Sequence, residues 1–231
     1  MNNINLICLP YAGGCSNIYR NYFYDLGLNI AVYPIELPGR GKRFMEARLE
    51  TFIDVITDVM DQIKPIIDTG QPYALFGYSM GSTIIFELYY KLMLFKYQPP
   101  KHMFFCASRP PVVRYQFESL TDEYLIEDLI DLGGTSKEVL DNKELLEICL
   151  PILRDDYKVM MSYQYKEHHS LIDNNITVML GMKDEKCIEC MDTWKGLSSK
   201  DCKMILYDGG HFFINEHSKE ISRYIVNVLE K

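Results

Sequence analysis

The sequence predicts an α/β fold in which a mostly parallel central sheet is flanked by helices on both faces. Short apolar runs, typical of buried strands, alternate along the chain with longer stretches whose apolar residues recur at helical spacing. Loops rich in glycine and proline follow several of the short runs, as at the carboxyl ends of strands in such folds. The 231 residues suffice for one large domain, and no internal repeat or low-complexity linker divides them. We therefore expect a single domain over residues 1–231.

The composition argues against several classes of protein. Hydrophobic residues make up 48% and charged residues 24%, the balance of a soluble globular protein. The net charge of −8 argues against binding to nucleic acid or to an anionic membrane. No apolar run approaches the ~20 residues that span a bilayer, and the first residues lack the basic segment of a signal peptide. Seven cysteines without framework-like spacing indicate free thiols, so we expect a cytoplasmic protein.

The amino-terminal part is expected to form two strands and two helices. The run Ile4–Leu9 predicts the first strand, which ends in the tight loop Pro10-Tyr11-Ala12-Gly13-Gly14. This loop either lends a backbone N–H to an oxyanion hole or is simply a strand-to-helix connection. Residues 19–26 predict a short helix, residues 30–33 the next strand, and Phe52–Ile67 an amphipathic helix.

The loop over residues 34–43 is rich in proline and glycine. It reads Pro34-Ile-Glu-Leu-Pro-Gly-Arg-Gly-Lys-Arg43 and carries three cations. Such a loop either contacts a substrate or merely turns the chain, and the residues alone leave both alternatives open.

A turn between the next strand and helix carries the strongest catalytic signal. The apolar run at 73–76 predicts a buried strand, residues 82–95 predict a helix, and Gly77-Tyr78-Ser79-Met80-Gly81 between them is a G-x-S-x-G motif. In such a turn the glycines let the backbones approach, and a strained central serine projects its hydroxyl at the top of the sheet. The helix start favours a developing oxyanion, for which the expected donors are the N–H groups of Met80 and Ala12. An ordinary strand-to-helix turn of small residues is the alternative.

Residues 112–170 interrupt the alternation of strands and helices. A buried strand at 102–107 is stopped by Ser108-Arg-Pro-Pro111, and no convincing strand follows before residue 176. Such an insertion is typical of a lid over an active site, although ordinary packing helices give the same pattern. The predicted helices of this insertion are 121–132, 143–150 and 151–165.

The carboxyl-terminal part returns to the alternating pattern. Strands are predicted at 176–180 and Cys202–Tyr207, and helices at 192–197 and 219–229. Cys187-x-x-Cys190 has the spacing of a metal or redox pair but lacks a second pair, so we interpret it as incidental helix positions. We expect no metal and no cofactor.

The histidines and aspartates supply partners for Ser79. A serine nucleophile needs a base within hydrogen-bond reach and a third group that orients the base. His211 follows a glycine pair directly after the last strand, where a loop can bring its imidazole over Ser79, so it is the candidate base. Asp184 follows the 176–180 strand and is the candidate acid, because Ser79, Asp184, His211 is the chain order of α/β-hydrolase triads. Asp208, on the loop of His211, and the more distant Asp173 are alternatives.

Seven stretches of the chain match a known group of enzymes in the same order. They are Leu9-Pro-Tyr-Ala-Gly-Gly14, Glu36-Leu-Pro-Gly-Arg-Gly-Lys-Arg43, Phe76-Gly-Tyr-Ser-Met-Gly81, Ser108-Arg-Pro-Pro111, Leu132-Gly-Gly-Thr135, Leu150-Pro-Ile-Leu-Arg-Asp155 and Gly209-Gly-His-Phe212. Together they resemble the type II thioesterases of nonribosomal peptide and polyketide synthesis, and the related medium-chain thioesterases of fatty-acid synthesis. The departures are mild, with Cys15 in place of a small residue such as serine and Tyr11 in place of a common phenylalanine.

The resemblance implies an α/β-hydrolase fold in which residues 112–170 form a mobile lid, with the same triad and oxyanion donors. That family hydrolyses acyl groups from the phosphopantetheine arm of carrier proteins. The implied partners are therefore acyl or peptidyl carrier protein domains of a synthase, and a monomer is expected because no long heptad pattern is present. Carrier proteins are acidic, so residues 40–43 are a candidate contact unless their cations only solvate a loop. A general carboxylesterase and a non-catalytic synthase-binding partner are the competing functions.

Overall fold

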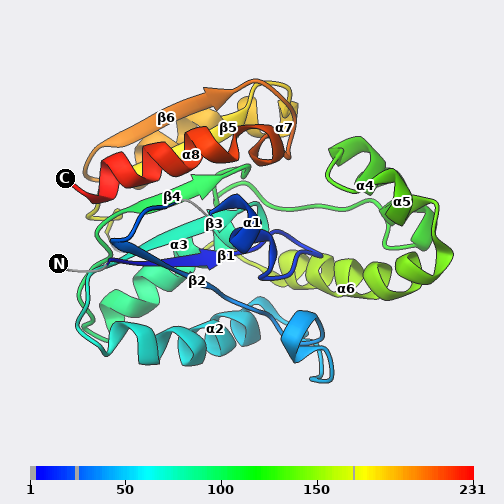
Figure 1. Ribbon diagram of the computed structural model, residues 1–231, viewed down its shortest axis with the longest axis horizontal. Coiled ribbons are helices and arrows are strands. Elements are labelled where there is room, and N and C mark those ends of the chain that lie inside the picture. Colours follow the sequence, from blue (N-terminus) through cyan, green and yellow to red (C-terminus); the bar gives the residue numbers. More distant parts are fainter. Residues whose placement is uncertain (1–3, 24–25, 169) are drawn as a thin grey trace.

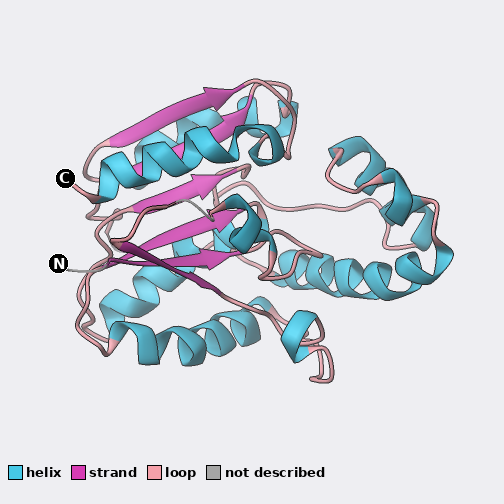
Figure 2. Ribbon diagram, in the orientation of Figure 1, coloured by secondary structure: helices cyan, strands magenta, loops and turns pink. Residues whose placement is uncertain are grey.

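The computed structural model describes residues 4–23, 26–168 and 170–231. In this part of the chain six parallel strands form one sheet in the order β2-β1-β3-β4-β5-β6 (Figures 1 and 2). The predicted α/β class is confirmed, and each predicted strand is present to within one or two residues. The strands are β1 (Ile4–Leu9), β2 (Ile30–Pro34), β3 (Tyr73–Tyr78), β4 (Met103–Cys106), β5 (Ile176–Gly181) and β6 (Cys202–Tyr207).

Two pairs of helices cover the two faces of the sheet (Figure 1). On one face lie α2 (Phe52–Ile67) and α3 (Met80–Leu94), and on the other lie α1 (Ile18–Tyr22) and α8 (Ile214–Leu229). The central strands are apolar on both sides because successive side chains point to opposite faces and both faces are buried. Ile7, Leu75 and Phe105 belong to the core under α2 and α3, and Leu6, Phe76 and Phe104 to the core under α8.

The strand order reverses between β1 and β3, and this reversal positions the site. Leu9 at the end of β1 pairs with Gly77 near the end of β3, so the loops that follow the two strands leave the sheet side by side. Open α/β sheets bind their ligands in the crevice at such a reversal, beyond the carboxyl ends of the strands. The loop of Ala12 and the turn of Ser79 therefore meet there.

The helices of the 112–170 insertion lie beyond the same edge, toward which the strand arrows point in Figure 1. They are α4 (Asp122–Leu132), α5 (Lys137–Leu140) and α6 (Lys143–Ser162). A small apolar cluster separate from the main core joins α4 to α6, so these helices pack on one another as well as on the sheet. Its buried members are Leu125, Leu150, Leu153 and Tyr157.

Several predicted helix boundaries were wrong. The expected helices 143–150 and 151–165 are one helix, α6, which runs through Pro151. Proline removes one N–H from the helix, but the buried residues on both sides of Pro151 pack on one continuous face, and this tertiary packing outweighs the local penalty. Helix α8 begins at Ile214 rather than at 219, because its first turns are mostly polar and show no apolar spacing.

The remaining differences concern short elements. The 192–197 segment is part of a 3₁₀ helix, Met191–Leu197, and α1 ends at Tyr22, whereas residues 24–25 of the predicted 19–26 helix lie outside the described residues. The four-residue helices α5 and α7 (Glu185–Ile188) and the 3₁₀ turn Gly41–Arg43 are too short to show a period. No helix in the described ranges combines the length and the apolar character that a bilayer span requires.

Candidate active site

Ser79 occupies a sharp turn between β3 and α3. Its φ of 52° is unusual for a residue with a Cβ, and such strain is concentrated at functional sites. The two glycines of the motif are required by close backbone contacts. A Cβ on Gly77 would lie 2.4 Å from the carbonyl oxygen of Gly81, and one on Gly81 would lie 2.1 Å from that of Leu9. The predicted strained turn is therefore present, held by backbone approaches that only glycine permits.

The side chains of Ser79, His211 and Asp184 form one hydrogen-bonded chain. His211 Nε2 lies 3.0 Å from the Oγ of Ser79, and His211 Nδ1 lies 2.7 Å from Oδ2 of Asp184. In the neutral imidazole, Nδ1–H donates to the carboxylate and Nε2 accepts the serine O–H. The structure thus brings the three predicted residues together in the arrangement that activates a serine.

The alternative aspartates lie elsewhere. Asp208 forms an exposed ion pair with Lys183 at 3.0 Å, and Asp173 pairs with Lys200 at 3.1 Å. Asp184 is instead buried at the start of α7. Its burial alone would raise the pKa, but the hydrogen bond from His211, with contacts from Cys187, outweighs that effect and holds the pKa below its ordinary value. Asp184 is therefore a carboxylate that can stabilise a protonated imidazole.

The amides predicted to bind an oxyanion lie on two adjacent loops. Met80 is the first residue of α3, so its N–H has no partner within the helix. Ala12 lies in the loop after β1 and lines the same cavity as Met80 and Ser79. Within the described ranges, neither N–H donates a hydrogen bond to another group of the protein. Both donors are thus free to receive a developing negative charge.

The loop of Ala12 is held by a buried ion pair that sequence reasoning missed. Arg40 and Asp156 make two hydrogen bonds of 2.6 Å, and the two residues are only 3% and 4% exposed. Asp156 also accepts the N–H of Gly13 at 2.7 Å, and Arg40 donates to the carbonyl oxygen of Gly14 at 3.3 Å. Asp156 directly follows the stretch 150–155, which contributed to the family resemblance, and this position was the one sign in the sequence that Asp156 has a role at the site.

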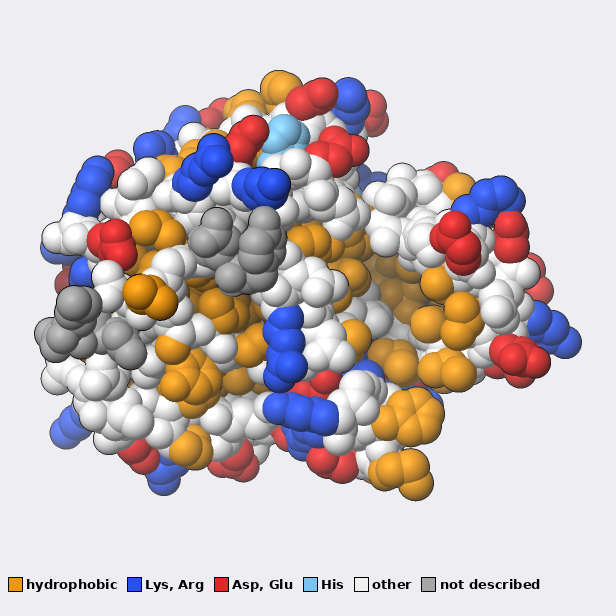
Figure 3. Space-filling model, viewed as in Figure 1, with side chains coloured by type: hydrophobic (Ala, Val, Ile, Leu, Met, Phe, Trp, Pro, Cys, Tyr) orange, Lys and Arg blue, Asp and Glu red, His pale blue; other side chains and the backbone are white. Residues whose placement is uncertain are grey.

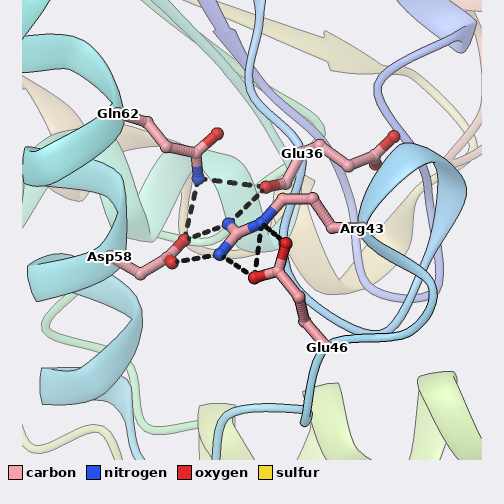
Figure 4. Close-up of polar contacts among 5 residues, drawn as sticks. All are labelled: Glu36, Arg43, Glu46, Asp58 and Gln62. Atoms are coloured by element: carbon pink, nitrogen blue, oxygen red, sulfur yellow. Dashed lines mark hydrogen bonds and ion pairs between the residues drawn. The ribbon is translucent and has the colours of Figure 1, made fainter.

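The two arginines of the 34–43 loop are paired with carboxylates of the protein itself. Arg40 is paired with Asp156, and Arg43 binds the carboxylates of Asp58 and Glu46 as well as the carbonyl oxygen of Glu36 (Figure 4). Of the three cations in this loop, only Lys42 is exposed. The suggestion that residues 40–43 form a basic docking patch is therefore wrong for both arginines, which have structural roles.

Tyr78 fixes the loop that carries His211. Its hydroxyl donates to the carbonyl oxygen of His211 at 2.5 Å, and its ring stacks on that of Phe212. Sequence reasoning treated Tyr78 only as a variable position of the serine motif. The bond joins the residue before the nucleophile to the backbone of the candidate base.

A largely apolar cavity of about 320 Å³ opens onto the triad. One wall is the catalytic edge of the sheet, and the other is formed by the helices of the insertion, so the cavity lies between body and insertion. The hollow between these parts is visible in Figure 3, where hydrophobic side chains gather in it. Leu129, Leu132, Val139, Leu153 and Tyr157 line the wall formed by the insertion.

The other histidines that the structure describes do not form a hydrogen bond with Ser79. Burial lowers the pKa of His102 to about 4, and its Nε2 lies 2.8 Å from the hydroxyl of Thr177. His168 stacks on Tyr90, and His217 lies in α8 beside Glu220. His169 lies outside the described residues.

The fold, with its serine turn at the strand reversal, is that of the α/β-hydrolases. Within that class the chain belongs to the thioesterase domain family, whose model matches residues 4–228, and it is a thioester hydrolase. The gramicidin S biosynthesis protein GrsT of Aneurinibacillus migulanus is 31% identical over 98% of this chain and 89% of its own length. The medium-chain S-acyl fatty acid synthase thioesterase of Homo sapiens is 28% identical over 97% of this chain and 87% of its own.

Comparison with solved structures places the chain in the same group of proteins. ClbQ, from the colibactin NRPS/PKS pathway, superimposes with a TM-score of 0.92 at 30% identity, covering 99% of this chain and 97% of that one. The resemblance to the type II thioesterases inferred from the sequence is thereby confirmed.

Proposed function

We propose that this protein is an editing thioesterase that removes acyl groups from the phosphopantetheine arm of carrier protein domains in a nonribosomal peptide or polyketide synthase. The observation that carries the proposal is the hydrogen-bonded chain Ser79–His211–Asp184 at the mouth of an apolar cavity. ClbQ comes from the colibactin NRPS/PKS pathway and GrsT is a gramicidin S biosynthesis protein, and these two relatives support the substrate class. We further propose that it acts in the cytoplasm, as a monomer and without a cofactor of its own.

The reaction proceeds in two steps. Ser79 Oγ attacks the thioester carbonyl carbon while His211 Nε2 takes the serine proton, and the carboxylate of Asp184 stabilises the resulting imidazolium. The N–H groups of Ala12 and Met80 bind the tetrahedral oxyanion. The carbon–sulfur bond breaks, the leaving thiol takes the proton from the imidazolium of His211, and an acyl ester remains on Ser79. Water, deprotonated by His211, then attacks this ester, and the imidazolium returns the proton to Ser79 Oγ as the carboxylic acid is released.

The lining of the cavity favours a substrate with an acyl chain over a strongly polar one. Its wall in the insertion consists mainly of apolar side chains, both aliphatic and aromatic, which favour burial of a hydrocarbon chain. We propose that the insertion acts as a lid and that the packing of α4 on α6 sets the length of chain admitted. The human relative named as a medium-chain fatty acid synthase thioesterase supports a site of this kind.

Two other functions remain as outcomes of the test. A general carboxylesterase would use the same triad but ignore the carrier protein. A non-catalytic synthase-binding partner would keep the fold without turnover, and the intact triad argues against it.

The experiment compares hydrolysis of a short acyl group on a carrier protein, on coenzyme A and on nitrophenol, for wild type and Ser79→Ala. We expect the acyl-carrier to be cleared faster than the coenzyme A thioester, with both activities lost in Ser79→Ala. Turnover of the nitrophenyl ester alone would indicate a general esterase. Turnover that does not depend on Ser79 would refute the catalytic assignment.

A further inference from the structure

The side chain of Cys187 lies beside the triad and has no part in the proposed mechanism. Cys187 is in α7, three residues after Asp184, and is only 3% exposed. It nevertheless lines the cavity that contains Ser79, so a small solute in the cavity reaches it. The thiol of Cys190, the other member of the Cys187-x-x-Cys190 pair, donates to the backbone carbonyl oxygens of Lys186 and Cys187. The pair does not act as a unit, whereas Cys187 alone is placed against the catalytic groups.

Asp184, Cys187 and His211 offer three kinds of metal-binding atom in one place. A carboxylate oxygen, the thiol sulfur and a ring nitrogen all lie within 4.8 Å of one another. In the portion of the chain that the structure describes, this is the one group of three such residues. Oxygen, nitrogen and sulfur donors together suit Zn²⁺, and three protein ligands leave its fourth tetrahedral position open.

We propose that Asp184, Cys187 and His211 form an inhibitory binding site for Zn²⁺, with the fourth position of the ion facing the cavity. Binding itself depends only on these three side chains, whereas inhibition rests on the triad of the proposed function. A tetrahedral zinc ion spaces its oxygen and nitrogen ligands roughly 3.4 Å apart, so the 2.7 Å contact between Asp184 and His211 must open by roughly 0.7 Å. His211 follows the glycine pair Gly209-Gly210, and this loop allows such a shift of the ring.

Zinc at this position stops catalysis by exchanging the tautomer of His211. In the metal-free triad the proton is on Nδ1 and Nε2 accepts the hydroxyl of Ser79. When Nδ1 binds the metal, that proton moves to Nε2, which then has no lone pair for the serine proton. The thiol of Cys187 releases one proton to solvent and binds as the thiolate, and the carboxylate of Asp184 binds without a proton change. No oxidation or reduction takes place.

The inhibition test compares Zn²⁺ titrations of thioester hydrolysis, each expressed relative to the metal-free rate of the same variant. Removing one direct ligand weakens a metal site by at least about tenfold, so Cys187→Ala should require at least about tenfold more Zn²⁺ for half inhibition than wild type. Cys187→Ser serves as a second variant of nearly the same size. The matched control is Cys149→Ala, because Cys149 lines the same cavity but lies in α6, away from the triad, and this variant should keep wild-type sensitivity.

A binding test that does not depend on activity uses Cd²⁺ and the Ser79→Ala protein. A cadmium–thiolate bond has an ultraviolet charge-transfer absorption, and we expect one such bond per chain from Cys187 in addition to any from the partly exposed cysteines. This increment should be absent from Ser79→Ala/Cys187→Ala. An absent increment, or equal Zn²⁺ sensitivity of wild type and Cys187→Ala, would overturn the site. If the wild type hydrolyses no thioester, the proposed function fails while the cadmium measurement still decides the site.

Discussion

Arg40, in the loop after β2, and Asp156, in helix α6 of the insertion, form a buried two-bond ion pair that also holds the loop of Ala12. The pair joins three parts of the chain that are far apart in sequence. Because Asp156 accepts the N–H of Gly13, the residue next to the proposed oxyanion donor, the position of this donor depends on α6. Helix α6 of the insertion and the loop of Ala12 are therefore mechanically connected.

The first prediction concerns removal of Asp156. Asp156→Ala leaves the buried guanidinium of Arg40 without its ion-pair partner, which should lower the free energy of unfolding by about 3–5 kcal/mol. The neighbouring Asp155 is the control, because its pairs with Arg48 and Lys158 are partly exposed and Asp155→Ala should cost less than about 1 kcal/mol. Urea denaturation of the two variants measures the difference.

A double variant separates stability from catalysis at this pair. Arg40→Met/Asp156→Leu removes both charges, so the unfolding free energy should return close to that of wild type. The N–H of Gly13 then has no acceptor, and kcat should stay at least about tenfold below wild type with a smaller change in KM. Wild-type kcat in a stable double variant would show that the pair does not position the oxyanion loop.

The second prediction concerns the hydroxyl of Tyr78. Tyr78→Phe keeps the ring but loses the hydrogen bond to the carbonyl oxygen of His211, which should cost about 1 kcal/mol of stability and lower kcat several-fold. Tyr73, at the other end of β3, donates a similar bond of 2.6 Å to Gln98 and is a matched control. Tyr73→Phe should show the same loss of stability with unchanged kcat. Equal kcat values for both variants would remove Tyr78 from the positioning of His211.

The third prediction concerns Gly81, two residues after Ser79. In Gly81→Ala the new methyl group meets the backbone carbonyl of Leu9 at 2.1 Å, so the turn must shift at a cost of about 3 kcal/mol or more, and activity should be lost. Gly196→Ala is the control, because a Cβ there meets no atom within 4 Å. Thermal unfolding should distinguish the two. A Gly81→Ala protein with wild-type stability and activity would show that the close approach is not required.

The fourth prediction is a pH dependence of stability from His102. Burial lowers its pKa from the ordinary 6.5 to about 4, so the unfolded chain binds this proton first as the pH falls. Neutral His102 therefore contributes to the free energy of unfolding above pH 6.5. This contribution, about 3 kcal/mol, is lost as the pH falls from about 6.5 to 4. Plots of the unfolding free energy against pH should therefore be steeper for wild type than for His102→Gln over that range. Parallel pH profiles would mean that His102 is not held neutral in the folded protein.

The strands and the serine turn could be predicted from the sequence because their signals are local. Buried strands in a parallel sheet are continuous apolar runs, and the glycines around Ser79 are fixed by the turn itself. Chain order among α/β-hydrolases also selected Asp184 over Asp208. The structure brings Ser79, His211 and Asp184 together, while their catalytic roles remain a prediction.

What could not be predicted depends on contacts between distant parts of the chain. Helix α6 continues through Pro151 because of packing that no local propensity reports. From the sequence, Arg40 is one of several cations in a loop. Its partner Asp156 is 116 residues away in sequence and reaches it only because α6 packs beside the loop. Cys187 reads as an incidental helix position because its distance to His211 depends on how the loops after β5 and β6 meet.

The central claim is that Ser79 carries the acyl group, and mass spectrometry of the acid-quenched enzyme and its peptides tests it most directly. The enzyme is mixed with an excess of an acyl thioester, quenched in acid within one turnover and then digested. We predict an added mass equal to the acyl group, located on the peptide that contains Ser79 and absent from Ser79→Ala. An adduct on Cys187 or Cys149, or turnover without any adduct on Ser79, would contradict the account.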